Sequence, residues 1–241
     1  MTGYDRDRFG PAWLDADRNG CDTRNDILRR DLHAITLKPD THGCVVLTGV
    51  LEDPYTAARI DFVRGDSYSV DIDHVVALGN AWASGAWRYD VQERAALAND
   101  PLNLLAVDAG ANRSKGDSNA ASWLPPNKSY RCAFVARQIA VKAKYRLAVT
   151  PSEKAQMTRQ LARCPGQDLI PDVTHAPTRV DQNITDHSAA ASPSARPTSR
   201  GVSVYYENCD AARAAGAAPV RRGDPGYGPH LDRDGDGVAC E

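Results

Sequence analysis

Short runs of apolar residues, several with a two-residue alternation, dominate the first half of the chain. They predict strands at residues 44–51, 60–65, 67–76 and 104–108, all rich in Val, Ile and Leu. The turn Gly65-Asp66 joins the second run to the third, so we expect these two strands to pair with each other.

Apolar residues at helical spacing follow in longer stretches. Residues 80–100 form one of them, in which Trp82, Trp87 and Leu97 are expected to face the core. Two further helices are predicted between residues 129 and 164. Together with the short strands, these helices predict an α+β fold.

The last of these helices carries its own start signal. Thr150 is a typical N-cap, with Pro151 at the first helical position and Glu153 placed to close a capping box. A short turn between two antiparallel helices puts the start of the first beside the end of the second. Cys132 and Cys164 are therefore expected to lie together.

Six cysteines fall into separated pairs along the sequence, which favours disulfides and an oxidising compartment. The neighbouring pairs are Cys21 with Cys44, Cys132 with Cys164, and Cys209 with Cys240. Counting alone leaves other pairings open. The chain has no C-x-x-C motif, no start resembling a signal peptide and no apolar run that could span a bilayer. We expect a mature secreted protein without a membrane span.

The composition changes near residue 165 and again near residue 202. Between these points Ser, Ala, Pro and Arg prevail, and too few apolar side chains remain to offset the entropy lost on ordering. The sequence therefore predicts a body at 1–165, a flexible linker at 166–202 and a tail domain at 203–241. The net charge of −2 argues against a protein that coats nucleic acid, but not against an enzyme with one basic face.

Polar residues suited to phosphodiester cleavage flank the third and fourth predicted strands. Asp73 and His74 end one strand, Asn103 precedes the next, and Asn112 and Lys115 follow it on one helix face. A neutral histidine can take a proton from water, and carboxylate and amide oxygens suit Mg²⁺ or Mn²⁺. A strand end, a turn asparagine and a solvated helix start would explain the same residues structurally. Adjacent strand side chains point to opposite faces, so the Asp-His pair can share a site only where the strand ends or twists.

The body resembles HNH endonucleases of the ββα-metal class, in a branch of secreted bacterial nucleases. The resemblance spans most of residues 4–165 and rests on "GCDTRNDILRRDL", "DPYT", "DIDHVVALGNAW", "SGAW", "NDPLNLLAVDAGANRSKGD" and "WLPP". The stretches "DIDHVV" and "NRSKGDSN" are also similar to the HNH module of RNA-guided nucleases. One departure is Ala77, where the family usually has proline, which loosens the loop after His74.

This resemblance implies a ββα-metal nuclease core with added helices and strands, and a role for each polar residue. His74 would be the general base, and Asp73 and Asn112 would be the metal ligands. Asn103 would orient the loop that carries the histidine, and Lys115 would contact the phosphate or the leaving group.

Basic residues gather in the second half of the body. Arg113, Lys128 and Arg131 are the ones expected to contact nucleic acid, as part of a basic face between residues 113 and 146. For the residues after Lys128, an ordinary solvated helix face is an equally good explanation. Nothing in this region is built for reading bases, so little sequence specificity is expected.

The tail contains "LDRDGDGVACE", in which Asp232, Asp234 and Asp236 precede a glycine as at the start of an EF-hand loop. The tail resembles the excalibur calcium-binding domain over essentially its whole length. The resemblance implies Ca²⁺ binding and a Cys209–Cys240 disulfide, and so short a domain needs both to stay folded. An acidic solvated turn is the alternative.

A similar pattern near the N-terminus places Asp15, Asp17, Asn19 and Asp26 at ligand spacing. These residues would either hold a second Ca²⁺ or form a turn beside Cys21, and the sequence favours the turn.

The combined expectation is a secreted, monomeric, metal-dependent endonuclease that hydrolyses DNA, with RNA as an alternative substrate. The resemblance adds 5′-phosphate products. The tail is expected to stabilise the protein or to tether it to a surface or wall polymer. One rival is a non-catalytic protein that binds DNA or cell wall in a calcium-dependent way on an HNH scaffold. A cytoplasmic restriction-type enzyme is another, which the paired cysteines argue against.

Overall fold

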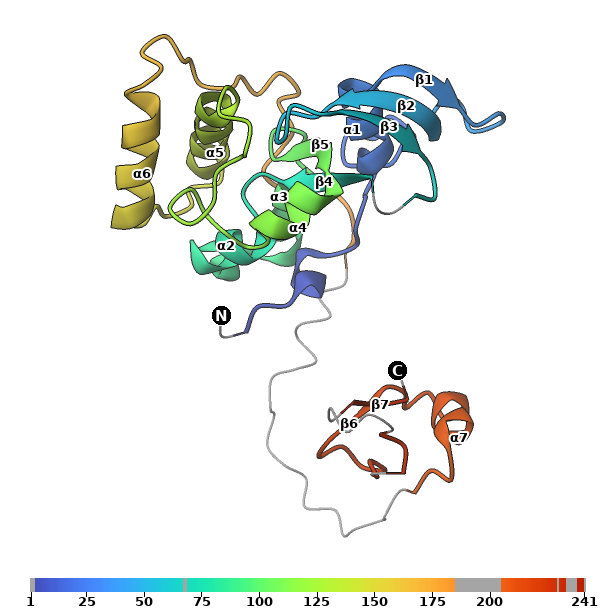
Figure 1. The fold of residues 1–241 in the computed structure, drawn as a ribbon. Coiled ribbons are helices and arrows are strands. Elements are labelled where there is room, and N and C mark those ends of the chain that lie inside the picture. Colours follow the sequence, from blue (N-terminus) through green and yellow to red (C-terminus); the bar gives the residue numbers. More distant parts are fainter. Residues whose placement is uncertain (1–2, 67–68, 185–204, 229, 233–237, 241) are drawn as a thin grey trace. The chain divides into compact units, whose positions relative to one another are not determined.

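The computed structural model describes residues 3–66, 69–184, 205–228, 230–232 and 238–240 (Figure 1). The chain divides into two compact units, Met1–Ser192 and Pro193–Glu241. Small sheets and helices alternate in the first unit, so the predicted α+β class is confirmed. None of the helices in the described residues has the length and apolarity needed to cross a bilayer.

Antiparallel strands form two sheets in the first unit. One sheet has the strand order β1–β2–β3, and the other pairs β4 with β5. The strands are β1 (His33–Leu37), β2 (Val46–Glu52), β3 (Arg59–Val63), β4 (Val70–His74) and β5 (Leu104–Asp108). The sequence pattern predicted all of them except β1, whose residues are mostly exposed.

The predicted pairing of β3 with β4 across Gly65-Asp66 is wrong. Strand β3 pairs with β2, and β4 pairs with β5, so that Asp73 lies opposite Leu105. Burial explains the difference, because β4 and β5 are buried over most of their length, whereas only Phe62 of β3 is buried. Turn residues such as Gly-Asp predict only that the chain reverses direction locally. The pairing partner of a buried strand is decided by burial, because such a strand pairs with another buried strand.

Helices make up most of the remaining regular structure of the first unit. They are η1 (Arg6–Phe9), α1 (Thr23–Asp31), α2 (Leu78–Ala83), η2 (Ala86–Arg88), α3 (Val91–Ala98), α4 (Ala109–Lys115), α5 (Arg131–Lys144) and α6 (Pro151–Leu161). Helix α1 lies against β2 and β5, α4 against β4 and β5, and α5 against α6 (Figure 1).

The single helix predicted over 80–100 is broken into α2, η2 and α3. Gly85 lies between α2 and η2 with a φ of 128°, a conformation that side-chain-bearing residues rarely adopt and that ends the helix. Helix α3 then begins with a capping box of its own. Trp82 and Leu97 are buried as predicted, but Trp87 falls in the short η2 turn and is 53% exposed.

Strand β5 separates two apolar clusters. Leu104 and Ala106 belong to a cluster with α1 and the first sheet, and Leu105 and Val107 belong to one with α4, α5 and α6. The two-residue period of a strand thus places both faces of β5 in the core. Strand β4 pairs along the whole of β5, from Val70 opposite Asp108 to His74 opposite Leu104.

The C-terminal helices of the first unit form as the sequence predicts. Thr150 and Glu153 make the capping box at the start of α6. The Cys132–Cys164 disulfide joins the first turn of α5 to the residues after α6, which packs beside it (Figure 1). The other bonds are Cys21–Cys44 and Cys209–Cys240, so the six cysteines pair as expected.

The linker predicted at 166–202 starts too early. Val180 and Ile184 are buried in the apolar cluster of η1, α2 and α3, and Asp172 accepts a hydrogen bond from Lys144 at 2.7 Å. These side chains are too widely spaced to form a pattern in the sequence. Each nevertheless contacts the helices of the body. Residues 185–204 lie outside the described part of the chain, so the rest of the linker stays a prediction.

Within its described residues, the second unit has few regular elements. They are α7 (Cys209–Ala214), β6 (Val220–Arg221) and β7 (Val238–Ala239), with β6 and β7 antiparallel. The Cys209–Cys240 disulfide borders a small apolar cluster that includes Val220 and Leu231. A core of this size needs such a covalent link.

A buried ion pair between α5 and α6 allows a test of their packing. Lys142 Nζ lies 2.6 Å from Glu153 Oε1, and both side chains are at most 2% exposed. Lys142→Met leaves a buried carboxylate without its counter-charge, so we expect the free energy of unfolding to fall by about 3–5 kcal/mol. The double variant Lys142→Met/Glu153→Gln should recover much of this loss. Urea unfolding of both proteins measures the difference, and equal losses would contradict a charge-pairing origin.

Candidate active site

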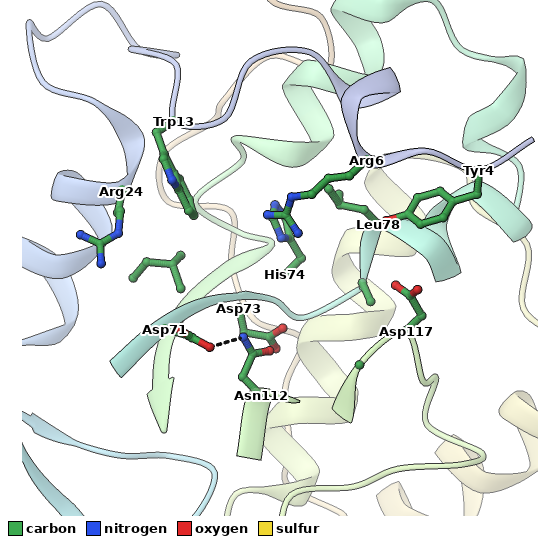
Figure 2. A pocket seen from close by; sticks show the side chains of 13 residues that line it. Tyr4, Arg6, Trp13, Arg24, Asp71, Asp73, His74, Leu78, Asn112 and Asp117 are labelled. Atoms are coloured by element: carbon green, nitrogen blue, oxygen red, sulfur yellow. Dashed lines mark hydrogen bonds between the residues drawn. The ribbon is translucent and has the colours of Figure 1, made fainter. Parts of the chain in front are cut away.

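A cavity of about 460 Å³ lies at the end of β4 (Figure 2). Asp71, Asp73 and His74 of β4 line this cavity together with Asn112 of α4. Strand β4 ends at His74, so neighbouring side chains with opposite orientations both reach the cavity. The structure therefore brings three members of the predicted site, Asp73, His74 and Asn112, to one place.

His74 is buried, and its ring has a defined hydrogen bond. Nε2 lies 2.9 Å from the carbonyl oxygen of Ala98, which can only accept, so Nε2 carries the proton and Nδ1 keeps its lone pair. Burial lowers the pKa of His74 to about 3, and the positive charges of Arg6 and Lys115 act in the same direction. The imidazole is thus held neutral in the tautomer that can accept a proton at Nδ1.

The carboxylate of Asp73 is held by two donors. Lys115 Nζ donates to Oδ1 at 2.8 Å, and the hydroxyl of Tyr55 donates to Oδ2 at 2.5 Å. Burial raises the pKa of Asp73, and the neighbouring Lys115 opposes this shift. Each carboxylate oxygen has a second lone-pair site, so Asp73 keeps capacity for a further cation.

The role predicted for Lys115 does not agree with its position. Its side chain is 1% exposed and donates to Asp73 and to the backbone carbonyl of His74 at 2.9 Å. Asn112 and Lys115 do share one face of α4, but this face is turned to β4, where the ammonium group balances a buried carboxylate. Lys115 is therefore part of the support of the site and is not placed to contact a phosphate.

Asp71 belongs to the site although the sequence reading did not include it. The amide nitrogen of Asn112 donates to Asp71 Oδ2 at 3.1 Å, which leaves the amide oxygen as the atom of Asn112 that can bind a cation (Figure 2). The signal was present in the sequence, because Asp71 and Asp73 are two residues apart on one strand and share a face.

The donor set of the cavity fits a hard divalent cation. Two carboxylates and one amide oxygen are available from Asp71, Asp73 and Asn112. Within the described residues no group of three His, Cys, Asp or Glu side chains is arranged to hold a metal by itself. Mg²⁺ is usually bound through one or two carboxylates and keeps several waters, so this sparse oxygen set suits Mg²⁺ or Mn²⁺ better than Zn²⁺.

Asn103 is fully buried and holds the chain that follows His74. Its Oδ1 accepts from the amide of Val76 at 2.8 Å, and its Nδ2 donates to the carbonyls of Val76 and Leu97, each at 3.3 Å. Gln138 supports the same loop through the carbonyl of Val75. The loop is thus firmly anchored in spite of the alanine that follows it, and the contribution of Asn103 to activity stays a prediction.

The basic residues predicted to contact nucleic acid do not line the cavity. Arg113 and Lys128 are exposed, and Arg131 is half-buried with its Nε donating to the carbonyl of Pro125 at 2.7 Å. Further along the proposed basic face, Lys142 and Lys144 form internal ion pairs. Their contact with substrate stays a prediction, since charge counting along a helix does not show which cations are already paired.

Sequence reasoning also missed residues ahead of the first cysteine. Tyr4, Arg6 and Trp13 line the cavity, as does Arg24 of α1. The Trp13 ring lies nearly parallel to that of His74, with 6.5 Å between ring centroids and 13° between ring planes. No spacing or motif marks these residues, because only the folded chain brings them to β4.

Residues 22–160, more than half of the chain, match the family described as GmrSD restriction endonucleases, C-terminal domain. The chain belongs to this family. Residues 206–241 match the Excalibur calcium-binding domain. An uncharacterized secreted protein of Arthroderma benhamiae is 39% identical over 166 residues, which cover 68% of this chain and 77% of that protein. No solved structure matches the chain.

These matches confirm the resemblance to an HNH-like endonuclease domain followed by an Excalibur domain. A GmrSD-type domain implies nuclease activity on nucleic acid and suggests a metal ion, and the Excalibur domain implies calcium binding. Three disulfides and the secreted relative confirm the predicted location outside the cell. The roles of individual residues in the GmrSD-type domain stay predictions.

The predicted calcium ligands of the Excalibur domain are only partly described. Asp232 is buried and accepts a hydrogen bond from the Tyr227 hydroxyl, and Arg222 Nη2 lies 4.0 Å from the same oxygen. Asp234 and Asp236 lie outside the described residues. Calcium binding follows here from the Excalibur match, and the three ligands stay a prediction.

The acidic loop near the N-terminus forms a hydrogen-bonded turn. The amide of Asn19 donates to Asp15 and Asp17, and its side-chain nitrogen donates to Asp17 and Asp26. Carboxylates that accept from N–H groups two to four residues away are typical of Asx turns. The structure thus forms the turn that the sequence favoured.

Asn103 should matter for stability because it satisfies buried backbone groups. Asn103→Ala leaves the Val76 N–H without an acceptor, so we expect the free energy of unfolding to fall by about 1–3 kcal/mol in urea titrations. Asn183→Ala, at an exposed position of the same unit, serves as the control and should change it by less than about 0.5 kcal/mol. Equal effects of the two substitutions would show that the loop holds without Asn103.

Proposed function

We propose that this protein is a secreted, metal-dependent endonuclease that hydrolyses DNA phosphodiester bonds with little sequence preference. The observation that carries the proposal is the hydrogen bond from His74 Nε2 to Ala98, which leaves Nδ1 as an acceptor in the cavity lined by Asp71, Asp73 and Asn112. A histidine in this tautomer beside an oxygen-rich cation site is the arrangement that hydrolysis of a phosphodiester needs. The GmrSD-type domain and the ββα order of β4, β5 and α4 support it.

His74 is the general base in this proposal. It takes a proton from the attacking water at Nδ1, while the bond to Ala98 holds the ring and stabilises the charge that forms at Nε2. A phosphate bound in the cavity brings negative charge close to the ring, which favours the protonated imidazolium.

Asp73 and Asn112 would hold Mg²⁺ or Mn²⁺, with Asp71 directing the amide of Asn112. When bound, the ion supplies positive charge that neutralises the phosphate and the leaving 3′ oxygen. Lys115 and Tyr55 keep the Asp73 carboxylate in one orientation. Products with 5′-phosphate ends follow from the family resemblance.

The substrate preference rests on the chemistry of the cavity walls. The guanidinium groups of the lining can bind backbone phosphates, and phosphate contacts carry no information about base sequence. DNA is therefore proposed as the substrate without strong sequence preference, and RNA is the alternative substrate. The Excalibur domain is proposed to bind Ca²⁺ and to stabilise the protein or tether it to a surface or wall polymer, with the protein acting as a monomer.

Cleavage of supercoiled plasmid tests the catalytic assignment. We expect nicking and linearisation with Mg²⁺ or Mn²⁺, none with EDTA, and a rate at least about 100-fold lower in His74→Ala because proton transfer to a positioned base is lost. His175→Ala, at an exposed position of the same unit, is the matched control and should cut like the unmutated protein. A protein that cuts neither DNA nor RNA with Mg²⁺, Mn²⁺ or Ca²⁺ would favour the non-catalytic binding protein.

Selective removal of Ca²⁺ separates the two proposed metal sites. With EGTA and excess Mg²⁺, cutting should persist. The Excalibur domain should unfold at a lower temperature, because it loses the stabilisation provided by bound Ca²⁺. A ligand present at 100 times its Kd adds about 2.7 kcal/mol to the free energy of unfolding. Calorimetry of the full chain, with and without EGTA, measures the shift. Loss of cutting under these conditions would tie Ca²⁺ to the nuclease site.

A further inference from the structure

The segment from Tyr4 to Leu14 forms one wall of the cavity. Tyr4, Arg6 and Trp13 line it, although they precede residue 22, where the match to the nuclease family begins. Because this wall lies outside the domain shared with the nuclease family, it can have a role other than the shared cleavage reaction. Binding of the substrate is one such role.

This wall is built into the fold. Phe9 is 1% exposed in the core, and Arg94 Nε donates to the carbonyl of Arg8. At the far end, the amide of Leu14 donates to Asn99 Oδ1 at 3.0 Å, and Asn99 is itself buried. The backbone that carries the side chains lining the cavity is thus held in place before any ligand binds, which lowers the entropy lost on binding.

Two guanidinium groups at the cavity have no close partner. Arg6 and Arg24 both line it, and within the described residues neither side chain forms a hydrogen bond or a close ion pair. By contrast, the Nε groups of Arg64 and Arg131 donate hydrogen bonds to backbone carbonyl oxygens. An arginine without a partner offers its planar set of N–H donors to a phosphate.

The electrostatic surroundings of Arg24 fit an anion rather than a second cation. Burial and the nearby Arg64 lower the pKa of Arg24, and Asp22 and Asp71 offset this only in part. In Figure 2, Arg24, Trp13 and Arg6 follow one side of the cavity, and Asp73 and Asn112 lie on the other. A nucleic-acid strand between the two sides would meet arginines on one and the oxygen ligands on the other.

Trp13 adds an aromatic surface beside the reacting groups. It is half-buried with a φ of 58°, which is rare for so bulky a side chain and persists only where the surrounding structure enforces it. Indole rings at nucleic-acid sites stack on bases without regard to sequence, but only on bases that are not paired.

We propose that this wall, together with Arg24 of α1, binds an unpaired nucleic-acid strand through Arg6, Arg24 and Trp13. The two arginines bind backbone phosphates on either side of the scissile bond, and Trp13 stacks on an adjacent base. The inference deepens the proposed function and rests on it, because it assigns the nuclease cavity its substrate form.

Binding of a labelled oligothymidine to the full-length protein tests the wall without cutting. Fluorescence anisotropy is followed over a salt series in a His74→Ala background, with Ca²⁺ present and Mg²⁺ absent. Arg6→Gln and Arg24→Gln should each weaken binding about fivefold and lower the slope of log K against log salt by about 0.7. Arg159→Gln, an exposed arginine of α6 outside the cavity, is the control and should change binding less than about twofold.

The tryptophan is tested in the same assay. Trp13→Leu should weaken binding of the oligothymidine about tenfold with an unchanged salt slope, and Trp13→Phe, which keeps an aromatic ring, should retain most of the affinity. Binding of a duplex of the same length should respond much less to Trp13→Leu. The proposal is overturned if the arginine variants bind like Arg159→Gln, or if Trp13→Leu affects the duplex as much as the single strand.

Cutting of plasmid and of single-stranded DNA by the unmutated protein tells the two proposals apart. If the protein fails to cut with any of the metals while oligothymidine binding depends on the two arginines and Trp13, the proposed function fails and the wall stands as a binding site. If the protein cuts normally and the three variants bind like the control, the wall fails and the nuclease stands.

Discussion

A buried carboxylate at the end of β4 governs the arrangement of the whole site. Asp73 is 4% exposed, and a charge removed from water to this degree needs a partner. Lys115 provides the opposite charge from α4, and Tyr55 provides a hydrogen bond from the loop between β2 and β3. One side chain thus ties the second sheet to α4 and to the loop that joins β2 and β3 of the first sheet.

This constraint decides what the other polar residues can do. With α4 held against β4, Asn112 meets Asp71, and the two carboxylates of the strand face the cavity beside the neutral imidazole of His74. Since Lys115 balances the carboxylate, it is not available to substrate. Positive charge for a phosphate must come from elsewhere, and the N-terminal segment and α1 bring Arg6 and Arg24 to the same cavity.

Local signals in the sequence predicted secondary structure correctly where interactions between residues close in the chain decide the outcome. The strand at 104–108 forms at the residues predicted, and Thr150 with Glu153 begins a helix because both partners of a capping box lie within one turn. The same kind of reasoning failed for the partner of β4. The Gly65-Asp66 pair indicates a turn, but it does not show which buried strand pairs with β4. It failed again at Trp87, where one glycine interrupts the apolar periodicity.

The sequence by itself determined the chemical content of this protein: an Asp-x-Asp-His strand end, the asparagines that follow it, the paired cysteines and the acidic tail. Only the tertiary structure decided how that content is used. Lys115 is 42 residues from the carboxylate it pairs with, and Arg6 comes to the cavity from a segment with no motif of its own. Burial and charge pairing depend on neighbours distant in the chain, so the direction of a lysine or the tautomer of a histidine is fixed only once those neighbours have packed.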